Sequence, residues 1–156
     1  MIKSYSEVSG QLILYSQYEF YYSNSKLKRF DKKQYDFNTG QIELLESSTY
    51  TYTGNNITGS VNTDFFMGAP DTVIYKYSFD NNDNYMAKNY AFFIDYLFLY
   101  DIDGSSLPLV FSKNNVIKVL DDPDEIPVTY NRDSKNNFYE FYLDGELVSR
   151  YLYDCK

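Results

Sequence analysis

Apolar and polar residues alternate along most of the chain, and short clusters of Asn, Asp, Gly and Ser interrupt the alternation. The segment YTYTGNNITGS (50–60) is typical, because Tyr alternates with Thr, Gly-Asn-Asn follows, and alternation resumes at Ile57. Successive side chains of a strand point to opposite faces, so this pattern predicts a strand with its tyrosines toward the core. The Gly-Asn-Asn cluster then predicts a tight turn into a second strand.

Similar clusters predict turns elsewhere: Ser23-Asn24-Ser25, Asn38-Thr39-Gly40 and residues 81–84. The segment DTVIYKYSFD (71–80), which precedes the last of these, has one apolar face. That face carries Val73, Tyr75, Tyr77 and Phe79. The opposite face is polar apart from Ile74, so the segment is expected to be a half-buried strand.

Asp144-Gly145 predicts a final hairpin with a two-residue loop of the primed type. That loop sets the expected pairs: Leu143 with Glu146, Phe141 with Val148, Tyr139 with Arg150, and Phe138 with Tyr151. Arg150 is then expected beside an aromatic ring, a contact worth about 0.5–1 kcal/mol at an exposed site.

Residues 89–104 (NYAFFIDYLFLYDIDG) depart from the strand pattern. Their aromatic and aliphatic residues recur at helical spacing: Phe92, Phe93, Tyr96, Leu97 and Tyr100. With Asn89 as its N-cap, a short amphipathic helix is expected over about residues 89–100. A buried strand is the alternative, because periodicity alone does not separate the two for a short apolar run.

Composition supports a β fold. Aromatic residues make up 20% of the 156 residues, with 19 Tyr and 12 Phe, and aromatics favour half-buried pleated surfaces. The hydrophobic content of 44% suffices for a core in a single β domain, residues 1–156. The expected fold is all-β: a broad antiparallel meander sheet or partly open barrel, with the one short helix packed on it.

Charge argues against nucleic acid as a partner. The formal net charge is -8 and the isoelectric point is near 4.4, whereas binding a phosphate backbone depends on Lys and Arg. The exception is KLKRFDKK (26–33), which is open to an acidic partner or to lipid headgroups. The favoured interpretation is an exposed sheet edge on which lysines prevent pairing with another chain.

The chain lacks residue types that several kinds of catalytic and metal site require. The chain has no His and no Trp, so Ser-His-Asp and Cys-His catalysis and His-ligated zinc are excluded. Its only Cys, Cys155, cannot form an intrachain disulfide. No apolar run is long enough for a transmembrane helix, and the visible N-terminus has no signal-peptide core. No cofactor is expected.

Two Asx-rich segments, DNNDN (80–84) and DIDG (101–104), resemble the start of a calcium loop. An acidic residue at position twelve would close such a loop, but Ala91 and Ser112 stand there. Turn chemistry is therefore favoured over metal binding. No metal site is predicted.

The densest acidic cluster is DDPDE, residues 121–125. A glycoside hydrolase uses paired carboxylates, but in a cleft that raises the pKa of one of them. Pro123 and Pro127 place this cluster in an exposed loop instead, so no catalytic residue is assigned.

The tyrosines suggest a different function. Sugars and apolar ligands stack on aromatic faces, and a groove that the helix leaves uncovered would fit a glycan, a peptide or a lipid. The competing interpretation is that the tyrosines only fill the boundary between core and water.

Three segments carry a resemblance to a known family: YTYTGNNITGS, LPLVFSKNNVIKV (107–119) and the closing hairpin around LDGELVSRYLYD. They resemble a secreted Bacteroides domain-of-unknown-function family described as having a porin-like fold, and more loosely YD-repeat proteins. The matching positions are Tyr50, Tyr52, Gly54, Asn55, Asn56, Ile57, Thr58, Ser112, Lys113, Asn114, Asn115, Val116, Lys118 and Val119. Asn131-Arg132-Asp133 departs from a Tyr-Asp pair found in that family.

The resemblance implies an antiparallel meander in an exported envelope protein, periplasmic or on the cell surface, with a lipid anchor in its precursor. It brings no catalytic residues. The predicted function is a non-enzymatic binding or structural module of the bacterial cell envelope. The alternatives are a carrier of a lipid or other apolar ligand, and a carboxylate-based glycoside hydrolase.

Overall fold

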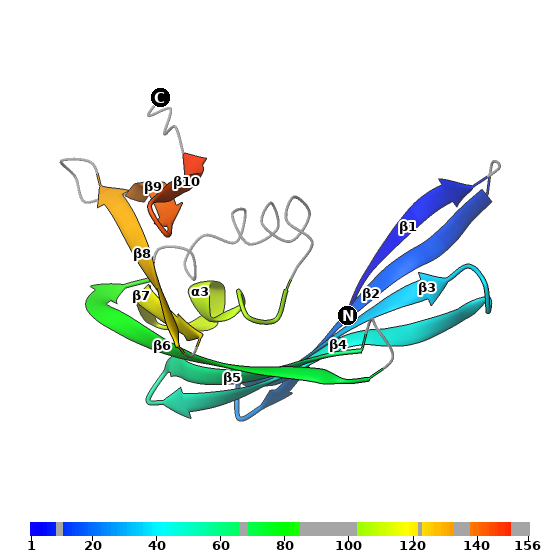
Figure 1. Cartoon of the computed structure of the whole chain (residues 1–156), viewed down its shortest axis with the longest axis horizontal. Helices are drawn as coiled ribbons and strands as arrows, with labels where there is room; N and C mark the ends of the chain where they lie inside the picture. The colour runs from blue at the N-terminus through cyan, green and yellow to red at the C-terminus, as the bar shows by residue number, and fades with distance from the viewer. Residues whose placement is uncertain (9–10, 66–68, 85–102, 122, 133–137, 151–156) are drawn as a thin grey trace.

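The computed structural model describes residues 1–8, 11–65, 69–84, 103–121, 123–132 and 138–150. These residues form one sheet of ten strands, in which each strand pairs antiparallel with the next along the chain (Figure 1). The strands are β1 (Ile2–Val8), β2 (Gln11–Ser23), β3 (Lys26–Asp36), β4 (Gln41–Thr53), β5 (Asn56–Asp64), β6 (Asp71–Asp83), β7 (Asn114–Asp121), β8 (Asp124–Arg132), β9 (Phe138–Leu143) and β10 (Glu146–Arg150).

The all-β meander is confirmed, and it is an open sheet with β1 and β10 at its two edges. The sheet bends strongly, so that both ends rise on the same side (Figure 1). Helix α3 (Pro108–Phe111) lies on the concave side of this bend. The helix predicted over residues 89–100 lies outside the described residues, and the sequence pattern did not predict α3. Pro108 in its first turn fixes a helical φ, and extended Ser112 ends it.

The predicted turns at glycine are confirmed by left-handed backbone. Gly40 has φ +72°, Gly54 has φ +60° and Gly145 has φ +79°. Asp144, at φ 50°, completes the predicted primed turn. Asn24 and Ser25 likewise reverse the chain between β2 and β3 with φ values of 51° and 59°.

The predicted turn at residues 81–84 is wrong, because β6 continues through Asp83 and pairs there with Asn114 of β7. The Asp80 carboxylate accepts hydrogen bonds from the backbone N–H of Asn82 at 3.0 Å and from Asn115 Nδ2 at 3.0 Å. The first bond is local to β6, and the second joins β6 to β7 across an irregular register. The Asx residues therefore hold two strands together instead of reversing the chain.

The predicted register of the last hairpin is correct only next to its turn. Leu143 pairs with Glu146 as expected, but a bulge then shifts the pairing, so that Phe141 lies opposite Ser149. The predicted pair of Tyr139 and Arg150 is therefore wrong. Arg150 instead lies opposite Glu140 and donates from Nε to its carboxylate at 2.8 Å.

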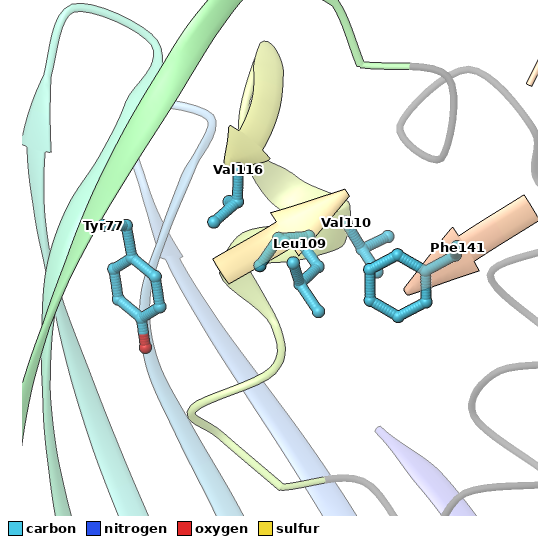
Figure 2. Packing of buried hydrophobic residues seen from close by; sticks show 6 residues of the cluster. Tyr77, Leu109, Val110, Val116 and Phe141 are labelled. Carbon is cyan, nitrogen blue, oxygen red and sulfur yellow. The ribbon is translucent and has the colours of Figure 1, made fainter. Parts of the chain in front are cut away.

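The core lies on the concave face in two clusters, one on each side of α3. Figure 2 shows the first, in which Leu109 and Val110 of the helix pack near Tyr77, Val116 and Phe141. The second cluster gathers the buried side chains of β2 to β5 beneath Leu107: Tyr18, Leu27, Phe30, Tyr50 and Ile57. Phe111 contacts both clusters, so the short helix joins the two halves of the bent sheet.

The basic segment KLKRFDKK lies in β3, between β2 and β4. The prediction of a sheet edge is therefore wrong. Two of its cations form ion pairs, since Arg29 forms a bidentate pair with buried Asp31 at 2.7 Å and Lys33 pairs with Glu19 at 2.9 Å. The first pair lies within β3, and the second joins β3 to β2.

Candidate functional site

The turn that follows the predicted DIDG loop is fixed to the concave face of the sheet. The backbone N–H of Gly104 donates to Glu46 Oε1 at 2.8 Å, and Tyr50 donates from its hydroxyl to the Gly104 carbonyl at 2.9 Å. Tyr77 donates in the same way to the Ser105 carbonyl at 2.8 Å. Burial raises the pKa of both tyrosines far above the ordinary value, so they remain neutral donors. Three sheet side chains thus hold this turn in place.

Beside this turn lies a cleft of about 180 Å³, which we term the acidic cleft. Its lining residues come from β4, β5, β6 and the turn: Glu46, Asn62, Asp64, Asp71, Val73, Tyr75 and Asp103. Three of its carboxylates occupy one row across the sheet, because Glu46 pairs with Asp64 and Asp64 pairs with Asp71. Like charges directly opposite each other repel and destabilise a sheet, so this row of carboxylates lowers the free energy of unfolding.

Glu46 is the most strongly buried carboxylate of the cleft. Burial, and then the negative charge of Asp103, raise the pKa of its carboxyl above the ordinary value of 4.5. The Gly104 N–H and the Ser48 hydroxyl act in the opposite direction, because both donate to Oε1.

A raised pKa means that folded Glu46 binds its proton more tightly than unfolded Glu46 does. Ionising it therefore lowers stability as the pH rises above 4.5. Glu46→Gln keeps the Oε1 acceptor and removes the charge. We expect its free energy of unfolding, relative to wild type, to increase from pH 4 to neutral pH and then level off. Urea unfolding of both proteins at several pH values measures this, and a difference independent of pH would contradict it.

A larger hollow, of about 420 Å³, lies at the end of the β3–β4 hairpin; we term it the aromatic hollow. Its residues combine rings and aliphatic groups with amides and carboxylates: Gln34, Tyr35, Asp36, Phe37, Asn38, Glu43, Leu44, Leu45 and Phe65. Its volume falls in the range of small-molecule sites, roughly 300–1,000 Å³.

Aromatic contacts order the rim of this hollow. The Phe37 ring lies edge-on to Tyr35, with 5.0 Å between centroids, and 6.5 Å from Tyr15. Gln34 donates to the Tyr15 hydroxyl at 3.1 Å. The Asn38 N–H donates to Asp36 Oδ1 at 2.8 Å and holds the pKa of that carboxyl below its ordinary value. Phe37 nevertheless remains 55% exposed, so its ring is available to a ligand.

The acidic cluster DDPDE lies at the hairpin turn between β7 and β8, and Asp122 lies outside the described residues. Asp121 pairs with Asp124 at the turn between β7 and β8, and Pro123, Asp124 and Glu125 are exposed. Glu125 forms an ion pair with Lys118 at 2.6 Å. Within the part of the chain that the structure describes, no group of three Asp, Glu or Cys side chains is arranged to hold a metal ion. Cys155 and the first half of DIDG lie outside that part.

The tyrosines fall into two groups by burial. Tyr18, Tyr50 and Tyr77 are buried core residues, whereas Tyr15 and Tyr22 are exposed. The acidic cleft was missed at the sequence level because its carboxylates come from separate strands. Only the strand register brings them together, and no local spacing of residues indicates it.

No protein-family model, curated protein or solved structure matches this chain. The resemblance to the Bacteroides family therefore stays a prediction. No described helix combines the length and apolar character that crossing a membrane requires.

Proposed function

We propose that this protein is a non-enzymatic binding module whose aromatic hollow recognises a glycan. The observation that carries the proposal is the mixed lining of the hollow, in which exposed Phe37 adjoins Tyr35 among the side chains of Gln34, Asn38 and Glu43. A sugar ring has apolar C–H faces that stack on aromatic rings and hydroxyl groups that need amide and carboxylate partners. This lining offers both.

The alternatives have less support. A lipid carrier requires a dry apolar interior, whereas the described interior around α3 is filled by the two core clusters. A glycoside hydrolase requires a carboxyl that is free to transfer a proton. In the acidic cleft, Glu46 uses Oε1 to accept from Gly104 and Ser48, which favours a structural role. The cell-envelope location rests on the family resemblance alone.

The test is an oligosaccharide array, followed by titration calorimetry with the best binder. Phe37→Ala removes the exposed ring, and we expect it to weaken binding by about tenfold. Tyr22→Ala is the matched control, because Tyr22 is 56% exposed against 55% for Phe37 but lies outside the hollow. Tyr22→Ala should bind as wild type does. The absence of any glycan binder, or equal weakening by both substitutions, would contradict the proposal.

A further inference from the structure

Strand β1 forms one edge of the open sheet. It pairs with β2 on one side, and none of the described strands pairs with its outer side. The N–H and C=O groups along such an edge are a template for another strand, unless a proline or a bulge blocks it. The sequence of β1, IKSYSEV, contains no proline. The bulge between β1 and β2 leaves its extra residue, Tyr15, on β2, so the edge strand itself is regular.

The opposite edge, β10, is less suited to adding a strand. It is five residues long, against seven for β1. It also carries a bulge of its own, because Leu147 pairs with Tyr142 and Ser149 pairs with Phe141, which leaves Val148 as the extra residue. A bulge in an edge strand twists that edge away from a partner. Of the two edges, β1 is therefore the better site for an incoming strand.

The sequence of β1 is complementary to itself when two copies run antiparallel. A register centred on Tyr5 joins apolar, oppositely charged, hydroxyl and aromatic residues in turn: Ile2 with Val8, Lys3 with Glu7, Ser4 with Ser6, and Tyr5 with Tyr5 of the second copy. Pairs of these kinds stabilise antiparallel strands. A shift of two residues would place either Lys3 or Glu7 opposite Tyr5 and would lose the charge pairs, so the centred register is favoured.

The same register keeps the two faces of the sheet in line. Ile2 packs against the second core cluster, whereas Lys3 is exposed and Tyr5 is 55% exposed. Residues directly opposite each other point to the same face of a sheet. Each pair in the centred register combines two odd or two even positions. The core face of one copy would therefore continue into the core face of the other.

We propose that this protein forms a symmetric dimer, in which β1 pairs antiparallel with β1 of a second copy and joins the two ten-stranded sheets into one. Such an interface uses the same surface of both copies and closes at two. Pairing of β1 with β10 of another copy would instead build open chains. One strand edge buries little surface, so the dimer is weak and depends on concentration. It does not depend on glycan binding.

The test is sedimentation velocity of the full chain over a concentration series that reaches the millimolar range. Wild type should shift from monomer to dimer and form no larger species. Lys3→Glu alone, or Glu7→Lys alone, places like charges opposite each other twice, so each should weaken dimerisation by at least about tenfold. The double variant Lys3→Glu/Glu7→Lys should dimerise again, and so should an equal mixture of the two single variants.

Lys113→Glu is the matched control for charge. Lys113 is exposed and immediately precedes β7, and its reversal changes the net charge as much as Lys3→Glu does. This variant should dimerise as wild type does. Dispersed amide spectra of each variant would show that it remains folded.

A disulfide can locate the interface. In a Cys155→Ser background, Tyr5→Cys would bring two thiols opposite each other across the symmetry axis, within reach of a disulfide. Mild oxidation should then give a covalent dimer. Tyr22→Cys is the matched control, because Tyr22 is 56% exposed but lies in β2, and it should cross-link far less.

Several results would each overturn the proposal. These are a monomer at every concentration, assembly beyond the dimer, equal weakening by Lys3→Glu and Lys113→Glu, or failure of the double variant to dimerise. Equal cross-linking of Tyr5→Cys and Tyr22→Cys would do the same.

Discussion

Replacing Gly104 with alanine is expected to lower the free energy of unfolding by about 3 kcal/mol. A Cβ atom at this position would lie 1.9 Å from Ser48 Oγ, 2.5 Å from Ser48 Cβ and 2.6 Å from Glu46 Oε1. Ser48 is fully buried in a central strand and has no room to retreat. The turn would have to leave the sheet and lose its bonds to Glu46 and Tyr50. Urea unfolding measures the change.

Two controls separate close packing from backbone strain. In Gly54→Ala the new Cβ lies in open space, but the residue has φ +60°. Only the left-handed backbone conformation is then unfavourable, and we expect it to lower the free energy of unfolding by about 1–2 kcal/mol. In a Ser48→Gly background, the added cost of Gly104→Ala should be clearly smaller, because the two nearest atoms are gone. An unchanged cost in that background would show that contact with Ser48 is not the cause.

Phe30→Ala is expected to lower the free energy of unfolding by about 3–5 kcal/mol. This is the largest decrease expected from truncating one side chain of the second core cluster. Phe30 is completely buried, and its ring lies 5.3 Å from Phe20 and 6.3 Å from Tyr18 between centroids. Alanine would leave a cavity in the middle of the sheet beneath α3. The thermal and urea unfolding midpoints should both fall.

Ile74→Ala is the control for Phe30→Ala. Ile74 is 59% exposed on the opposite face of β6, so its truncation should change stability by no more than about 0.5 kcal/mol. A cost for Phe30→Ala as small as that of Ile74→Ala would mean that the concave face is not the protein's core.

The strands and most turns follow from the sequence because they depend on local rules. Tyr50 is buried, Tyr52 is half-buried and Thr51 is exposed, as the alternation predicts. Gly40, Gly54 and Gly145 have the positive φ that their turns need. These properties are decided within a few residues of each position, so no knowledge of distant contacts is required.

Features set by distant strands escaped prediction. The cluster at residues 80–84 resembles a turn, but the Asp80 carboxylate accepts a hydrogen bond from Asn115 of β7, and only the register between β6 and β7 shows this. The bulge between Leu147 and Ser149 cannot be predicted from the turn that precedes it. Likewise, Lys26 to Lys33 suggest an edge strand until the sheet order places β3 in the interior. Both candidate sites depend on this longer-range order.

Chemical-shift mapping with the best glycan from the array tests the central claim most directly. The account predicts that shifts concentrate on the backbone amides of Tyr35, Phe37 and Asn38 and on the side-chain amide of Gln34. Signals of Val110 and Val116, which are buried in the core beside α3, should not move. Shifts centred on α3, or on the acidic cleft around Asn62, would contradict the assignment of glycan binding to the aromatic hollow.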